Sequence, residues 1–162
     1  MEIPINVRVY CADGDCGRST RLIVNPVTRA VTHLVVRERD EPHTERLVAL
    51  KWIDRTTTDM ILLSCTWERL SKMSPFVVTR FLREALPDYE HPAESHVAWP
   101  YRVSYDVKTV QVQERRVPPH ELEVTPGTRV RATDGEIGHV NQFLVDPQDS
   151  HITHLVLREG HL

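Results

Sequence analysis

Residues Arg8 to Glu38 read RVYCADGDCGRSTRLIVNPVTRAVTHLVVRE, and residues Arg129 to Glu159 read RVRATDGEIGHVNQFLVDPQDSHITHLVLRE. When the two segments are laid over each other without a gap, 13 of the 31 positions are identical and most of the others keep their polarity. The offset of 121 residues is too long for a solenoid, whose repeats run roughly 20 to 50 residues. The chain therefore contains two copies of one structural unit, which we call the first copy and the second copy.

The pattern inside each copy predicts three strands separated by turns. Val7, Val9 and Cys11 alternate with polar residues, as in a strand buried on one face. An Asp-Gly pair then favours a hairpin turn, and a glycine three residues later favours a bulge or a close backbone approach. These turn positions are Asp13, Gly14 and Gly17 in the first copy and Asp134, Gly135 and Gly138 in the second.

The later strands of each copy are delimited by proline. Asn25-Pro26 and Asp146-Pro147 end an apolar run, because proline donates no backbone hydrogen bond, and a β-rich segment follows each turn. After the first copy, residues 46–53 and 59–64 predict two further strands, and Thr66 is suited to cap a short helical turn. The first copy thus has about five strands, and the second has three.

Composition places the chain among ordinary globular proteins. It has 162 residues, of which 40% are apolar and 27% charged. No apolar run approaches the ~18 residues that span a bilayer, and no leader-like segment opens the chain. We expect a cytoplasmic protein, either free or at the periphery of a membrane complex. The net charge of −3 disfavours general nucleic-acid binding.

The DGxxG turn, the run that ends in Asn-Pro or Asp-Pro, and the Thr-His-Leu-Val strand resemble, in this order, the PRC-barrel family. That family is named for the cytoplasmic domain of the photosynthetic reaction-centre H subunit, and a related barrel ends the ribosome maturation factor RimM. The resemblance implies an all-β chain built on a small, bent antiparallel barrel that docks onto proteins. It implies no shared catalytic residues.

The resemblance also predicts the domain organisation. Residues 1–73 form a complete barrel, residues 74–124 a Pro-rich linker or arm, and residues 125–162 a half-barrel of about three strands. Within the linker, residues 76–86 fit either an amphipathic helix or an extended arm, and residues 107–112 fit one more strand. Two strands that a PRC barrel would add after Leu162 are missing, as in a chain cut from a longer protein or completed by something else.

An unfinished sheet leaves backbone groups without partners, at about 1 to 3 kcal/mol for each buried group. We therefore expect a homodimer joined through residues 125–162, since a two-fold axis would let two half-barrels close one another. Two other completions stay open. The half-barrel could pair with the linker strand near residues 107–112, or close within the chain around the first barrel.

The sequence predicts no catalytic, metal or cofactor site. Cys11, Cys16 and Cys65 form no CxxC pair, and we interpret them as buried thiols. The nine histidines match no zinc spacing, and the acidic residues of the turns are expected to be solvated. No GxSxG or similar nucleophile motif occurs. We therefore expect a protein that is not an enzyme.

The leading functional interpretation is a non-catalytic module that positions another macromolecule and associates with itself. Trp99 and Tyr101, beside Pro100 in the linker, are the candidate docking residues, since aromatic side chains are enriched at interface hot spots. The alternative is an RNA- or ribosome-particle adaptor of the maturation-factor type. That role would need a basic patch made by five arginines: Arg18, Arg21, Arg29, Arg37 and Arg39.

Overall fold

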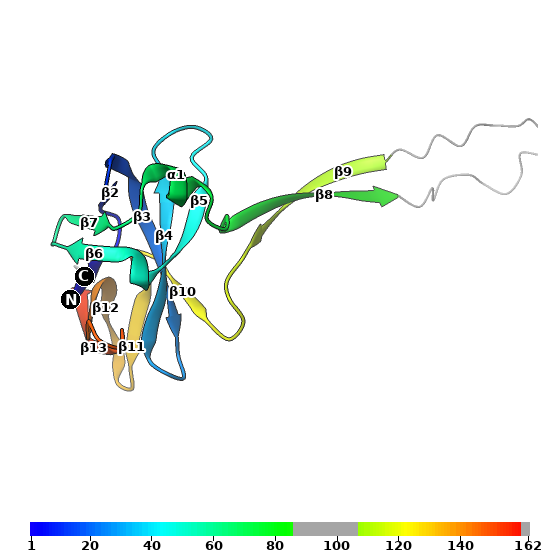
Figure 1. Ribbon diagram of the computed structural model, residues 1–162. Helices are drawn as coiled ribbons and strands as arrows, with labels where there is room; N and C mark the ends of the chain where they lie inside the picture. Colours follow the sequence, from blue (N-terminus) through cyan, green and yellow to red (C-terminus); the bar gives the residue numbers. More distant parts are fainter. Residues whose placement is uncertain (86–106, 160–162) are drawn as a thin grey trace, which may run out of the picture. The chain divides into compact units, whose positions relative to one another are not determined.

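The computed structural model describes residues 1–85 and 107–159. In this part of the chain it contains thirteen β-strands, one short α-helix and one 3-10 turn (Figure 1). The all-β fold expected from the sequence is therefore confirmed. The chain divides into two compact units, a main unit of Met1–Val77 with Arg115–Leu162 and a hairpin unit of Val78–Glu114.

The first copy and the residues after it form six strands of the main unit: β2 (Arg8–Cys11), β3 (Gly14–Asn25), β4 (Ala30–Glu38), β5 (Glu45–Ala49), β6 (Ile53–Thr56) and β7 (Met60–Leu63). They follow the order β5–β4–β3–β2–β7–β6 in one sheet, and every pair is antiparallel except β2 with β7. The pairings of the described residues include none between β5 and β6. They therefore do not show the sheet closing into the expected barrel.

The segment expected as one strand over residues 46–53 is instead broken. After β5 the chain makes a 3-10 turn, η1 (Leu50–Trp52), before β6 begins at Ile53. The turn keeps Leu50 buried and leads the chain into β6, which pairs with β7. The short helix α1 (Trp67–Ser71) starts where the sequence indicates, because the Thr66 side chain accepts a hydrogen bond from the Arg69 amide at 3.4 Å.

The second copy forms the three expected strands, β11 (Arg129–Ala132), β12 (Gly135–Val145) and β13 (Ile152–Arg158). β12 pairs with β11 and β13, as β3 pairs with β2 and β4. The glycines of both turns have positive φ: 137° at Gly14 and 149° at Gly17, against 150° at Gly135 and 149° at Gly138. Both copies therefore use the same hairpin geometry.

Each copy also receives a short strand from just before the other copy. The strand β1 (Glu2–Pro4) pairs with β12, so that Ile3 lies opposite Phe143. The strand β10 (Leu122–Val124) pairs with β3, so that Val124 lies opposite Leu22. Ile3 and Val124 are 121 positions apart, and so are Leu22 and Phe143. The two copies thus exchange strands reciprocally.

The turn after β3 and the turn after β12 contact each other through equivalent residues of the two copies. Ala30 forms an isolated antiparallel bridge with His151, its own equivalent in the second copy. The Val31 amide donates to the Ser150 carbonyl at 3.1 Å, and the Ile152 amide donates to the Arg29 carbonyl at 2.7 Å. Because exchanging the copies converts one hydrogen bond into the other, an approximate two-fold axis relates them.

The two copies share one apolar core. The largest side chain that the second copy buries there is Phe143, and Ile3 of β1 is fully buried beside it in the same cluster. Burying apolar surface contributes roughly 25 cal/mol per Å², so this joint core holds the second copy against the first. The buried core side chains from the second copy are Val140, Phe143 and Val145.

The described parts of the expected linker include two long strands. Residues Val77–Ala85 form β8 and residues Val107–Arg115 form β9, and the two pair with each other. The extended arm is therefore the correct alternative for this segment, and the amphipathic helix is wrong. Arg80 and Glu114 form an ion pair of 3.0 Å across the hairpin. Pairing of the second copy with the strand near residues 107–112 is also wrong, because β9 pairs with β8.

Candidate interaction surface

Two apolar side chains of the second copy are exposed although their equivalents in the first copy are buried. Leu155 is 39% exposed, whereas its equivalent in the first copy, Leu34, is 0% exposed. Ile137 is 48% exposed, whereas its equivalent, Cys16, is 0% exposed. In the first copy these positions are covered by elements that follow β4. The described part of the second copy has no counterpart of these elements.

The outer edge of β13 is also without a partner among the described strands. In the first copy the equivalent strand β4 pairs along this edge with β5, from His33 opposite Ala49 to Arg37 opposite Glu45. The structure pairs β13 with β12 alone. A free edge next to exposed apolar side chains is a surface that accepts another strand.

The hydrogen bonds of the first copy identify which amides of β13 face outward. The Glu38 amide donates to the Thr44 carbonyl at 3.0 Å, so alternate residues of β4, including Leu34 and Val36, direct their amides toward β5. By the offset of 121, the corresponding amides of β13 belong to Leu155 and Leu157. We call the outer edge of β13, together with the exposed Ile137 and Leu155 side chains, the open edge.

The opposite side of the second copy is completed within the chain. β1 pairs with β12 from Glu2 opposite Leu144 to Pro4 opposite Gln142, and the Val145 amide donates to the Met1 carbonyl at 2.8 Å. Closure within the chain around the first copy therefore supplies a strand on this side, as β10 does for β3, but it does not pair the outer edge of β13. Within the second copy, the outer edge of β13 has no partner among the described strands.

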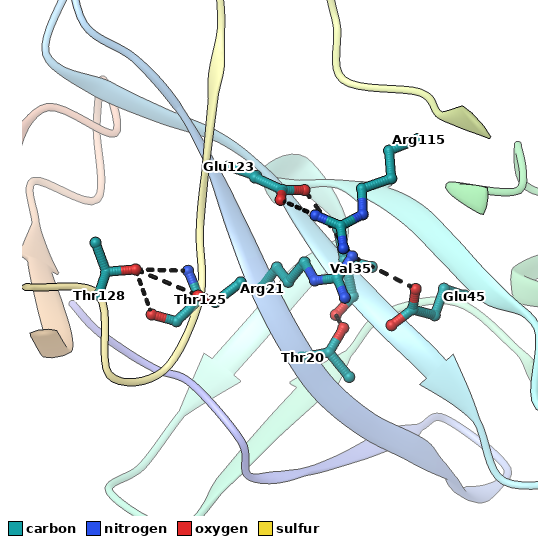
Figure 2. A network of polar contacts seen from close by, with 8 residues as sticks. All are labelled: Thr20, Arg21, Val35, Glu45, Arg115, Glu123, Thr125 and Thr128. Carbon is teal, nitrogen blue, oxygen red and sulfur yellow. Dashed lines mark hydrogen bonds and ion pairs between the residues drawn. The ribbon is translucent and has the colours of Figure 1, made fainter. Parts of the chain in front are cut away.

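A polar network surrounds Arg21 where β10 meets β3 (Figure 2). The Arg21 guanidinium lies 3.7 Å from the Glu45 carboxylate and 3.9 Å from that of Glu123, and it stacks over the Phe76 ring at 5.5 Å. Arg115 adds an ion pair to Glu123. Arg21 Nη1 and Glu123 Oε2 are buried without a hydrogen-bond partner among the described residues, so their mutual attraction is what offsets desolvation there.

This network pairs Arg21, one of the five arginines of the expected basic patch, with two carboxylates. Arg21 is half-buried and paired, and Arg29 lies in the turn between β3 and β4, at the far end of the hairpin from Arg18 and Arg37. The five arginines therefore do not form one face. Arg18, Arg37 and Arg39 do gather, together with Arg8 of β2.

A cavity of about 490 Å³ lies beside β5, η1 and α1. The charged groups of its lining are basic (Lys51, Arg69 and Lys72), and its walls include Trp52 and His33. Burial lowers the pKa of His33 below its ordinary value, and the Glu121 carboxylate, 3.7 Å away, opposes this shift. The lining holds no carboxylate and no thiol, and no hydrogen bond between described residues joins its Ser74 to His33 as nucleophilic catalysis would require.

The three cysteines are buried free thiols. A hydrogen bond that the neutral Cys11 thiol donates to Cys16, together with burial, strongly raises the pKa of Cys11, and burial raises the pKa of Cys65 to about 11. The thiolate is the reactive and metal-binding form of cysteine, so both thiols are suited to packing. In residues 1–85 and 107–159, no group of three or more His, Cys, Asp or Glu side chains is placed to hold a metal ion.

The candidate docking residues Trp99 and Tyr101 lie outside the described residues. No described helix is long and apolar enough to cross a membrane. The sequence matches no protein-family model and no curated protein sequence.

Proposed function

We propose that this protein is a non-catalytic assembly module of the PRC-barrel type that associates with itself through residues 125–162. The observation that carries the proposal is the open edge. Positions whose equivalents are fully buried in the first copy are exposed in the second, next to a strand edge without a described partner. The expected cytoplasmic location and the positioning of a further macromolecule belong to the same proposal.

A second copy of the chain is the occupant that suits this edge best. An antiparallel pair of β13 strands related by a two-fold axis would satisfy both open edges at once, without a third component. Centred on Val156, such a pair would place Leu155 opposite Leu157 of the other chain and His154 opposite Arg158. The two leucines would then lie on one face, and no two carboxylates or guanidiniums would face each other directly.

The expected affinity is modest. An interface made of one strand pair and a few apolar side chains falls below the size of stable protein complexes, which bury about 1,200 Å² or more. We therefore expect a reversible dimer with a dissociation constant in roughly the micromolar range, about −8 kcal/mol.

Sedimentation velocity of the full chain from about 1 µM to about 500 µM tests this proposal. We expect the wild-type protein to shift from monomer to dimer, and Leu155→Asp to stay monomeric because a desolvated carboxylate would face the partner. Val27→Asp is the matched control, because Val27 is an exposed valine in the turn between β3 and β4. A wild-type protein that stays monomeric, or a Leu155→Asp variant that dimerises equally well, would contradict the proposal.

An RNA-adaptor role is not proposed. The patch that it required is divided, since Arg21 is engaged by two carboxylates and Arg29 lies at the other end of the β3–β4 hairpin.

A further inference from the structure

Three arginines lie side by side across neighbouring strands of the first copy. Arg8 of β2 lies directly opposite Arg18 of β3, and Arg18 lies directly opposite Arg37 of β4. Residues opposite each other in antiparallel strands project from the same face of the sheet. All three side chains are exposed, on the face away from the buried Val9, Cys16 and Val36. We call Arg8, Arg18 and Arg37 the arginine row.

Like charges in directly opposite positions destabilise a sheet, and the nearby carboxylates compensate only in part. Glu38 points inward and pairs with Arg46 at 2.9 Å, and Glu45, opposite Arg37, pairs with Arg21. Asp15 lines the same hollow, where it accepts a hydrogen bond from the Gly17 amide at 3.1 Å. Within the described residues, none of the three arginines forms an ion pair.

The second copy repeats the row at the same register positions. Arg129 of β11 lies opposite His139 of β12, and His139 lies opposite Arg158 of β13. The outer two positions are arginine in both copies, and the central position changes from arginine to histidine. The alignment of basic side chains is thus a feature of the repeat.

The hollow beside the arginine row limits the kind of ligand it can hold. It has a volume of about 350 Å³, within the range of small-molecule sites. Its lining is made of arginine, acidic, glycine and histidine residues: Arg8, Asp15, Gly17, Arg18, Arg37, Glu38, Arg39 and His43. An aromatic platform, which single-stranded nucleic acids use for base stacking, is missing from this lining. The ligand that fits is therefore small, strongly anionic and without an apolar body.

From this arrangement we propose that the arginine row binds an oligophosphate, that is, a short linear chain of phosphate groups. Guanidinium groups bind phosphate oxygens through paired, charge-assisted hydrogen bonds. Neighbouring strands lie about 4.8 Å apart, so the row presents three cations over roughly 10 Å. An extended acidic peptide presents carboxylates on one face only every second residue, about 6.8 Å apart, and so places fewer negative charges along the row. Phosphates that share bridging oxygens follow one another more closely.

Isothermal titration of the full-length protein with inorganic tripolyphosphate at low salt tests the proposal. We expect saturable binding that Arg18→Gln and Arg37→Gln each weaken at least tenfold. Arg55→Gln is the matched control, because Arg55 is an exposed arginine of β6 outside the row, and it should bind as the wild type does. All three changes are at exposed side chains, and circular dichroism would verify the fold of each variant.

Four other ligands distinguish the source of the anion. Orthophosphate should bind more weakly than tripolyphosphate, and a nucleoside triphosphate should bind equally well if only its phosphate chain is recognised. The proposal would be overturned by the absence of tripolyphosphate binding at millimolar concentration, or by equal losses in Arg37→Gln and Arg55→Gln. Tighter binding of an RNA oligonucleotide or a hexaglutamate peptide than of tripolyphosphate would overturn it as well.

Discussion

Gly17 has a backbone position that no other residue type fits. A Cβ added there would lie 1.9 Å from the Arg37 carbonyl oxygen, whereas a Cβ added at Gly14 would meet no atom within 4 Å. Both glycines have positive φ, so any other residue is strained at either position, by about 1 to 3 kcal/mol. We expect Gly17→Ala to lose clearly more stability in urea unfolding than Gly14→Ala. Equal losses would mean that backbone strain alone, and not the contact with β4, requires Gly17.

His33 should make stability depend on pH. Its pKa is lowered by burial from the ordinary value of 6.5, so the unfolded chain takes up a proton at a higher pH than the folded chain does. The stability that neutral His33 contributes is therefore present above pH 6.5 and is lost as the pH falls toward the folded pKa. We expect His33→Gln to flatten the pH dependence of the unfolding free energy below pH 6.5. Parallel curves for the two proteins would contradict this assignment.

For single residues, the sequence predicted local backbone conformation better than side-chain contacts between distant strands. The turn glycines and the cap at Thr66 could be located because their backbone requirements are local. The pairing of Arg21 with Glu123 could not, because those residues meet only when β10 reaches β3. The arginine row depends on register in the same way: Arg8, Arg18 and Arg37 are far apart in sequence and adjacent only across the sheet.

Among the elements, β1 should contribute most stability for its length. Ile3 is fully buried in the core that both copies share and lies opposite Phe143. We expect Ile3→Ala to lower the free energy of unfolding by about 2 to 5 kcal/mol. Urea unfolding followed by circular dichroism measures this loss.

Val27→Ala is the control for the Ile3 substitution. Val27 is 85% exposed, so its truncation should change stability by less than about 0.5 kcal/mol. A comparable effect of the two substitutions would show that β1 does not hold the second copy in place.

The reciprocal strands β1 and β10 lie outside the compared segments, and at three residues each they carry no periodicity that predicts a strand. One signal could have found them. The offset of 121 continues upstream of the copies, where Glu2-Ile3 is equivalent to Glu123-Val124. The interruption of residues 46–53 by η1 was not predictable from alternation, because burial of Leu50 in a tight turn produces the same apolar pattern as a strand.

For the whole molecule, the internal repeat predicted an incomplete second copy but not how much of it the chain completes. Unpaired backbone groups at the edge of the second copy predict that another strand pairs with it. They do not predict whether that strand comes from the same chain or from another. An approximate two-fold axis through the Ala30–His151 bridge relates the two copies, and β1 pairs with one side of β12. On the other side of the second copy, β13 is the last described strand, and its outer edge is the open edge.

Hydrogen exchange at the amides of β13 tests the open edge most directly. At low protein concentration, the Leu155 and Leu157 amides should exchange rapidly, while the equivalent Leu34 and Val36 amides, which face β5, should be strongly protected. At high concentration, Leu155 and Leu157 should become protected as a second chain pairs with them. Protection at the lowest concentration would contradict an unpaired edge, and rapid exchange at every concentration would contradict self-association through it.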